Sequence, residues 1–111
     1  MAIQTETQRN NLATAYGQAA THGALYTTSP GATAGTEPTG SYARQPLTWS
    51  EASGGVVQAT ATFTVPAGAT IVGQGVHTAL TGGSYLDGGD VTSQNFATEG
   101  TTTVTFIYTQ S

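Results

Sequence analysis

The sequence contains no cysteine, no lysine and very few charges of either sign. Charged residues make up 7% of its 111 residues, whereas a soluble domain usually carries about 25%. The absence of cysteine excludes disulfide bonds, thiolate metal sites and cysteine nucleophiles together. The chain must therefore be stabilised by packing, either within the domain or against partners.

Positive charge is especially scarce. Arg9 and Arg44 are the only basic residues, and the formal net charge is −4. Nucleic acids and anionic membranes are bound through clusters of Lys and Arg side chains that face phosphate groups. We therefore expect neither nucleic acid nor a membrane as a partner.

Long apolar segments are also missing. No apolar run approaches the roughly 20 residues of a membrane-spanning helix. Residues 1–6 contain neither the basic nor the apolar region of a secretory signal. We expect one domain, synthesised in a cytoplasm.

Alternation of apolar and polar residues is strongest in residues 56–65. From Val57 to Val65 every odd position is apolar and every even position is Gln or Thr. Successive side chains of a strand point to opposite faces, so this segment predicts a strand with one apolar and one hydroxyl-rich face. The Pro-Ala-Gly sequence at 66–68 ends it, and a second β-rich run covers residues 70–80. Two strands around a short Pro/Gly loop predict a β-hairpin at the centre of the domain.

One helix is predicted, over residues 5–20. Thr5 and Gln8 have the spacing of a capping box, in which the first side chain accepts a hydrogen bond from the first turn of the helix. The apolar stripe of this helix is expected to consist of Leu12, Tyr16, Ala19 and Ala20.

Short β-rich segments separated by Gly- and Pro-containing turns fill the rest of the chain. Strands are predicted at residues 24–28, 42–50, 56–65, 70–80, 84–86, 91–98 and 101–109. Residues 29–41 form a long loop, and Asp87–Asp90 predicts a tight turn. The expected fold is mainly β: a single immunoglobulin-like or jelly-roll-like β-sandwich with a short N-terminal α-helix. Residues 1–22 would form a helical arm and residues 23–111 the β-sandwich domain.

Residues able to support catalysis or metal binding are few and scattered. His22 and His77 have no carboxylate at ligand spacing, so two polar histidines are favoured over a metal site that includes Asp87 or Asp90. The Asp87–Asp90 segment lacks the further carboxylates of a calcium loop, and no G-x-S-x-G segment marks a serine nucleophile. We therefore predict no enzyme activity, no catalytic residue, no cofactor and no metal.

The glycine and aromatic residues indicate packing and binding contacts and not a catalytic site. Gly73-Gln74-Gly75 lacks the third glycine of a nucleotide-binding loop and predicts either close approach to the backbone of a strand or coiling of the sheet. Most aromatic residues fall at core-facing positions. Tyr42 and Tyr85, beside Gly-rich turns, would instead suit an interface or a sugar-stacking patch. We predict an interface formed by Arg9, Leu12, Tyr16, Tyr42, Arg44 and Tyr85.

Several segments, in their order along the chain, resemble a family of small virion proteins from tailed phages of actinobacteria. The segments that carry the resemblance are Thr7–Ala13, Ala24–Thr28, Gly40–Gln45, Phe63–Gly68 and Ile107–Ser111. They span nearly the whole chain, and none is a catalytic signature. Proteins of this kind are head decoration, minor tail or tail fibre proteins. The resemblance implies a non-enzymatic structural component of a virion, assembled in the host cytoplasm.

Head decoration is the role that the sequence favours. Small size, few charges and the absence of a fibre-like repeat fit a compact subunit that binds and stabilises the outer surface of the major capsid shell. One alternative is a minor tail or tail fibre protein at the tail tube or tip. Another is a carbohydrate-binding module that uses Tyr42, Trp49 or Tyr85. The expected partners are the major capsid protein or tail proteins, and further copies of the chain, for example in a trimer.

Overall fold

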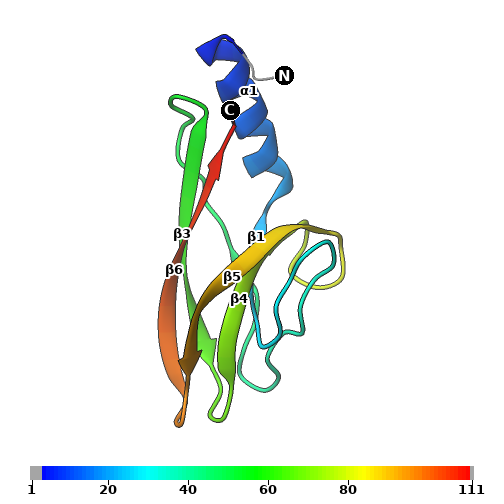
Figure 1. The fold of residues 1–111 in the computed structure, drawn as a ribbon, viewed down its shortest axis with the longest axis vertical. Helices are drawn as coiled ribbons and strands as arrows, with labels where there is room; N and C mark the ends of the chain where they lie inside the picture. The colour runs from blue at the N-terminus through cyan, green and yellow to red at the C-terminus, as the bar shows by residue number, and fades with distance from the viewer. Residues whose placement is uncertain (1–3, 111) are drawn as a thin grey trace.

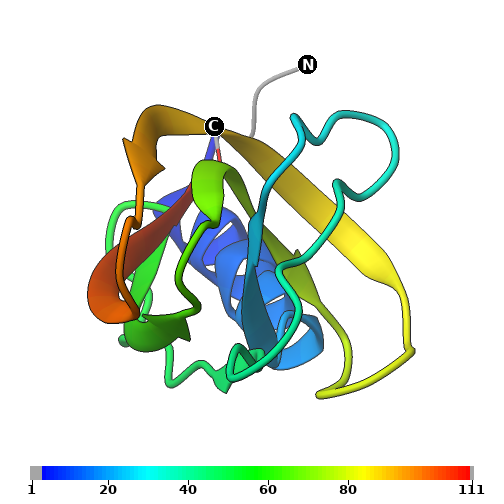
Figure 2. The same ribbon diagram turned by 90° about the horizontal axis from the view of Figure 1, so that it is seen from below.

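A computed structural model describes residues 4–110, which form one helix and two antiparallel sheets (Figures 1 and 2). The elements are α1 (Glu6–Ala19), β1 (His22–Tyr26), β2 (Gln45–Pro46), β3 (Val56–Val65), β4 (Thr70–His77), β5 (Tyr85–Asn95) and β6 (Gly100–Thr109). One sheet has four strands in the order β2-β1-β4-β5, and the other consists of β3 and β6. We refer to them as the four-stranded and the two-stranded sheet.

Helix α1 begins where the sequence predicts. The Thr5 side chain accepts a hydrogen bond from the backbone N–H of Gln8 at 3.3 Å. This bond satisfies one of the amides in the first turn of the helix that have no partner within the helix. Ala13 is fully buried and Tyr16 is half-buried, but Leu12 is 36% exposed. The helix therefore turns the face with Ala13 and Tyr16 toward the two-stranded sheet. The predicted stripe is wrong at Leu12 and Ala19, which are both exposed.

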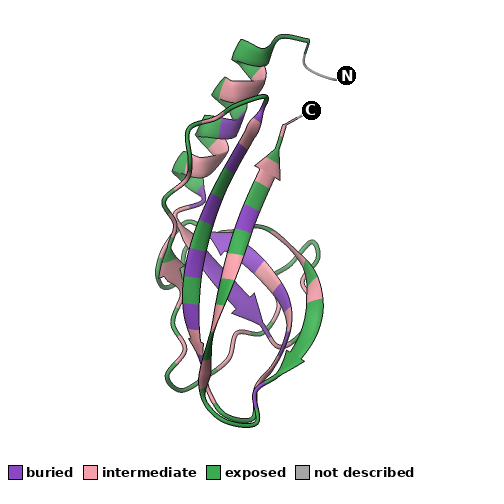
Figure 3. Cartoon of the chain, turned by 90° about the vertical axis from the view of Figure 1, so that its left-hand side faces the viewer, coloured by how far each residue is buried: buried purple, intermediate pink, exposed green. Residues whose placement is uncertain are grey.

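The two strands of the two-stranded sheet pair over their whole length. The pairing runs from Val56 opposite Thr109 to Val65 opposite Gly100. Along β3, buried and exposed residues alternate, and Figure 3 shows this as bands of buried and exposed residues. Alternation of this kind places all apolar side chains of a strand on one face. The strand predicted at residues 56–65 is confirmed.

Different elements cover the apolar face of the two-stranded sheet along its length (Figure 1). In the lower half of the view the four-stranded sheet packs on it, and there Phe63 and Phe106 meet edge to face with ring centroids 6.3 Å apart. In the upper half α1 lies against it, and there the Tyr16 and Tyr108 rings stack at 3.8 Å. The molecule is elongated as a result, with extents of 47 × 25 × 23 Å.

Phe63 lies in the core between the two sheets and is 0% exposed. Leu25 of β1 and Val76 of β4 belong to the same buried cluster. The Phe106 ring reaches the backbone of β1 at Gly23, where an added Cβ would lie 2.8 Å from a ring carbon. Only glycine at this position lets the ring pack directly on the strand.

The predicted hairpin between residues 56–65 and 70–80 is wrong. Strand β3 pairs with β6, whereas β4 pairs with β1 and β5. Residues 66–69 carry the chain from one sheet to the other, where Gly68 donates a backbone hydrogen bond to Phe96 at 2.6 Å. Strands β3 and β4 each have one strongly apolar face. Because they lie in different sheets, these two faces pack against each other, which would not be possible in a hairpin within one sheet.

The predicted turn at Asp87–Asp90 is also wrong, because β5 runs continuously through it. Gly75 of β4 lies opposite Gly88 of β5. A Cβ on Gly75 would lie 2.5 Å from the Tyr26 hydroxyl oxygen, so the missing side chain makes room for the tyrosine. The two strands predicted on either side of the turn are therefore one strand, and the close approach predicted at Gly73 and Gly75 is confirmed.

Residues 42–50 contain only the two-residue strand β2, not the long strand that was predicted. Pro46 has no N–H with which to extend the pairing. Beyond it, Leu47 donates its N–H to the Thr21 carbonyl at 2.8 Å, and the Trp49 indole N–H donates to the Ala20 carbonyl at 2.7 Å. These contacts hold the segment across the end of α1 instead of in a sheet.

The predicted fold class, a mainly β sandwich with an N-terminal helix, is confirmed. The loop at 27–44 adds a cover on the outer face of the four-stranded sheet (Figure 2), where Gly35 lies against the buried Tyr26 ring. The division into an arm (1–22) and a domain (23–111) stays a prediction, and its residues 1–3 and 111 lie outside the described part.

The two faces of β3 predict different costs of substitution. Phe63→Ala should lower the free energy of unfolding by about 3–5 kcal/mol, because it leaves a cavity between the sheets. Thr62→Ala, at an exposed position, should cost only about 0.5 kcal/mol. Denaturant titration of both variants measures the difference. Equal losses would mean that both faces of β3 are buried in the folded protein.

Candidate functional site

Arg44 joins segments of the chain that are far apart in the sequence. Its guanidinium donates to both carboxylate oxygens of Glu37, from Nε at 3.0 Å and from Nη2 at 2.9 Å. Its Nη1 donates to the carbonyl oxygens of Ala79 at 3.0 Å and Gly82 at 2.9 Å. A two-pronged Arg–carboxylate pair is geometrically specific as well as strong. The long loop is thereby fastened to the connection between β4 and β5.

Tyr42 completes this arrangement, which we call the Arg44 cluster (Glu37, Tyr42 and Arg44). Its hydroxyl donates to Glu37 at 2.7 Å and accepts the N–H of Leu25 at 3.1 Å. Its ring lies nearly parallel to that of Phe63, with centroids 6.3 Å apart. Burial raises the pKa of the Glu37 carboxyl, but hydrogen bonds from Arg44 and Tyr42 outweigh this effect, and the pKa lies below its ordinary value. Glu37 is therefore an ionised acceptor at neutral pH and not a proton donor.

A shallow pocket of about 460 Å³ opens beside the Arg44 cluster. Besides the cluster itself, its lining residues are Pro38, Ala43, Leu80, Thr81 and Gly82. Leu80 is 52% exposed at its rim. Because the charged groups on its wall are already paired, the pocket offers a partner shape and apolar contact more than charge.

His77 is buried in the four-stranded sheet and is 3% exposed. Its Nε2 lies 2.5 Å from the Tyr26 hydroxyl, and its ring contacts that of Tyr85. His22 lies opposite His77 in the β1–β4 register, but its Nδ1 pairs with the Thr21 hydroxyl at 2.9 Å. The two histidines are thus neighbours in the sheet with different partners.

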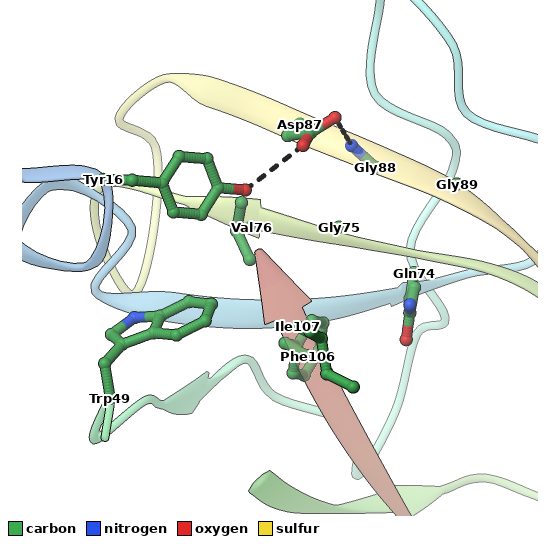
Figure 4. Close-up of a pocket in the computed structure, with 10 residues that line it drawn as sticks. All are labelled: Tyr16, Trp49, Gln74, Gly75, Val76, Asp87, Gly88, Gly89, Phe106 and Ile107. Atoms are coloured by element: carbon green, nitrogen blue, oxygen red, sulfur yellow. Dashed lines mark hydrogen bonds between the residues drawn. The ribbon is translucent and has the colours of Figure 1, made fainter. Parts of the chain in front are cut away.

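A second pocket, of about 180 Å³, lies where α1, β4, β5 and β6 meet (Figure 4). Tyr16 and Trp49 form one side, and the Tyr16 hydroxyl donates to Asp87 at 3.2 Å. Asp87 also accepts the N–H of Gly88 at 2.8 Å. On the other side, the side-chain oxygen of Gln74 is buried without a hydrogen-bond partner among the described residues. The pocket combines aromatic, carboxylate and amide groups, and its lining includes no Ser, Thr or Lys side chain.

Metal-binding groups and membrane-spanning helices are not found in the described part of the chain. Within residues 4–110, no group of three or more His, Asp or Glu residues could hold a metal ion. In the same range no helix is long and apolar enough to cross a membrane. The carboxylates near the pockets, Glu37 and Asp87, have hydrogen-bond partners of their own. The absence of enzyme activity stays a prediction.

The predicted interface residues lie in three separate places. Arg9, Leu12 and Tyr16 are on α1, although Tyr16 turns inward onto Tyr108. Tyr42 and Arg44 belong to the Arg44 cluster, which the sequence did not predict because Glu37 lies in a loop without regular structure. Tyr85 donates its hydroxyl to the Gly31 carbonyl at 2.9 Å. The residues offered for sugar stacking (Tyr42, Trp49 and Tyr85) are each occupied by internal contacts.

The exposed side of the two-stranded sheet carries a regular array that we call the threonine face. Its residues are Gln58, Thr60, Thr62, Thr64, Thr101, Thr103, Thr105, Ile107 and Thr109. Hydroxyl groups meet across it, Thr60 with Thr105 at 3.2 Å and Thr62 with Thr103 at 2.9 Å. The sequence showed both alternations but not that they share one face. Their equal length and matching period are the signal for this pairing.

Over residues 5–110, the chain matches a protein family described as podophage GP4 fiber I protein gp80. The chain is a structural protein of a phage virion, and it belongs to this family. No curated protein and no solved structure matches it. The resemblance to phage virion proteins is confirmed at this level, and the description of the family names a fibre.

Removal of the Arg44 side chain should destabilise the protein. Arg44→Met should lower the free energy of unfolding by about 2 kcal/mol, because it leaves a half-buried carboxylate and carbonyl oxygens without donors. Arg44→Lys should recover part of the loss, since lysine keeps the charge but not the two-pronged geometry. Denaturant titration checks both. A Met variant as stable as the wild type would show that the Arg44 cluster does not hold the loop.

Stability should fall in mild acid because of His77. Burial lowers the pKa of His77, nearby Arg44 lowers it further, and Glu37 opposes them. The folded protein thus binds this proton less tightly than the unfolded chain, so stability is fully present above the unfolded pKa of about 6.5 and is lost as the pH falls below it. Thermal unfolding at several pH values between about 7 and 5 measures the decline.

His77→Gln should remove most of this decline, whereas His22→Gln should retain it. The comparison uses slopes with pH and not absolute stabilities, so a general loss of stability in either variant does not affect it. An unchanged slope in the His77 variant would assign the acid sensitivity to another group.

Proposed function

We propose that this protein is a subunit of a phage tail fibre. The observation that carries the proposal is the family match over residues 5–110, because the family description names a fibre protein. The sequence favoured head decoration and offered the tail fibre as an alternative. The family match favours the alternative.

The shape of the molecule supports this role. The chain lacks a fibre-like repeat, but the folded domain is itself elongated, at 47 × 25 × 23 Å. The two-stranded sheet extends past the four-stranded sheet beside α1 (Figure 1). A short rod with strands along its axis can build a thin, extended assembly from few subunits. A capsid decoration protein does not require such an elongated shape.

The surface chemistry fits a structural role without catalysis. The threonine face has hydroxyl groups and no charge, and the pocket beside the Arg44 cluster has paired charges and an apolar rim. Surfaces of this kind bind through shape, apolar contact and hydrogen bonds, which are weak singly and add up in a repeated assembly. The partners that we propose are other virion proteins and further copies of this chain.

Copy number in the particle tests the proposal. Quantitative mass spectrometry of purified virions should find far fewer copies of this protein than of the major capsid protein, in a ratio like that of other tail components. A second tail protein of known stoichiometry serves as the internal standard. Copy numbers close to that of the major capsid protein would contradict a fibre and restore head decoration.

A further inference from the structure

Strand β6 has one edge that no other described strand covers. In residues 4–110 it pairs with β3 alone, and Figure 3 shows β3 on one side of it. On the side of β3 away from β6, Gln58 donates its N–H to the Ser50 hydroxyl at 3.1 Å and accepts the Ser50 N–H at 2.8 Å. Gln58 lies opposite Ile107.

The hydrogen bonds of Gln58 show which backbone groups of β6 point toward its open edge. Alternate residues of an antiparallel strand point their N–H and C=O groups to opposite sides. Because Gln58 points away from β6, its opposite residue Ile107 points away from β3, and so do the other odd residues of β6. The open edge therefore presents the backbone groups of Thr101, Thr103, Thr105, Ile107 and Thr109.

This edge lacks the features by which proteins protect exposed strands. Natural edges are blunted by charged side chains, proline, bulges or short length. Strand β6 extends over Gly100–Thr109 with no charge, no proline and no shift of register. The outer strand of the other sheet differs, since β5 carries Asp87 and Asp90 and its pairing with β4 is bulged. An edge as long and uncharged as that of β6 is suited to pair with another strand.

We propose that the β6 edge pairs with the β6 edge of a second copy of this chain. An antiparallel edge is complementary to itself, because a two-fold axis brings each N–H opposite a C=O. The outer edge of β3 is a poorer partner, since Ser50 and Ser53 already bond to its beginning. The absence of charge on both copies of β6 removes any repulsion between them. This inference concerns the isolated chain and does not depend on the proposed function.

The register follows from the length of the edge. With the axis at Thr105, Thr105 meets its counterpart, Thr103 meets Ile107, and Thr101 meets Thr109. All of the outward backbone groups then find partners. Ile107, which is 63% exposed in the single chain, is partly covered by the threonine of the second copy. The two threonine faces join into one continuous surface of four strands.

Single-cysteine variants test the register directly, because the chain has no cysteine of its own. Directly opposed residues in this pairing have Cα atoms about 5.5 Å apart, which lies within the range of a disulfide. Under mild oxidation Thr105→Cys should form a covalent dimer on denaturing gels. Thr62→Cys, exposed on the same face but on β3, should stay largely monomeric.

Paired proline variants test the edge without cross-linking. Thr105→Pro removes an N–H that points away from β3, so the fold should persist by circular dichroism while the dimer dissociates in analytical ultracentrifugation. Thr62→Pro is the matched control. Both variants lose one outward N–H and one hydrogen bond between threonine hydroxyls, but Thr105 lies on β6 and Thr62 lies on β3. Should Thr105→Pro unfold, Thr105→Lys keeps the backbone intact and should raise the dimer dissociation constant at least tenfold at low salt, with Thr62→Lys unchanged.

A wild-type dimer that responds to changes at Thr105 and not at Thr62 supports the proposal. It is overturned by a monomer at high micromolar concentration, by a dimer insensitive to Thr105, or by larger assemblies that cross-link only when cysteines are present at both positions. The last result would indicate head-to-tail pairing of β6 with β3.

Discussion

The apolar face of the two-stranded sheet is the surface against which the other layers pack. With no disulfide and few charges, the chain depends on this packing for most of its stability. The four-stranded sheet covers one half of the face, where its Leu25 and Val76 lie in one buried cluster with Phe63 and Phe106. Helix α1 covers the other half through the Tyr16–Tyr108 stack. Neither cover is long enough alone. The elongated shape follows from one long face buried by two different elements in succession.

Polar interactions hold the segments that apolar packing does not. The loop at 27–44 has little apolar content, yet it lies against the buried Tyr26 at Gly35. The Arg44 cluster holds it there with hydrogen bonds that leave few charged groups unpaired. Threonine is the most frequent exposed residue type in residues 4–110. We therefore expect contacts with other virion proteins to come from shape, hydroxyl groups and backbone edges.

Local patterns in the sequence predicted local structure well. The alternation that ends at Val65 and the cap at Thr5 each identified an element, because strand and helix periodicity depend on nearby residues. The partner of β3 was mispredicted, since a Pro/Gly loop can serve a hairpin or a crossing between sheets, and only the packing of distant faces decides. Asp87–Asp90 resembled a turn because of its two glycines, and only its pairing with β4, where Gly88 lies opposite Gly75, makes it part of a strand. The Arg44 cluster joins loops and left no periodic signal.

We propose that this domain belongs to a fibre in which strand β6 pairs with the β6 strand of another copy. An electron-microscopy reconstruction of the intact particle, at a resolution that separates β-strands, tests both parts together. The account predicts density for this domain in a tail fibre, with the β6 strands of two copies adjacent and antiparallel. Density for the domain on the capsid shell, with the β6 edge facing solvent, would contradict it.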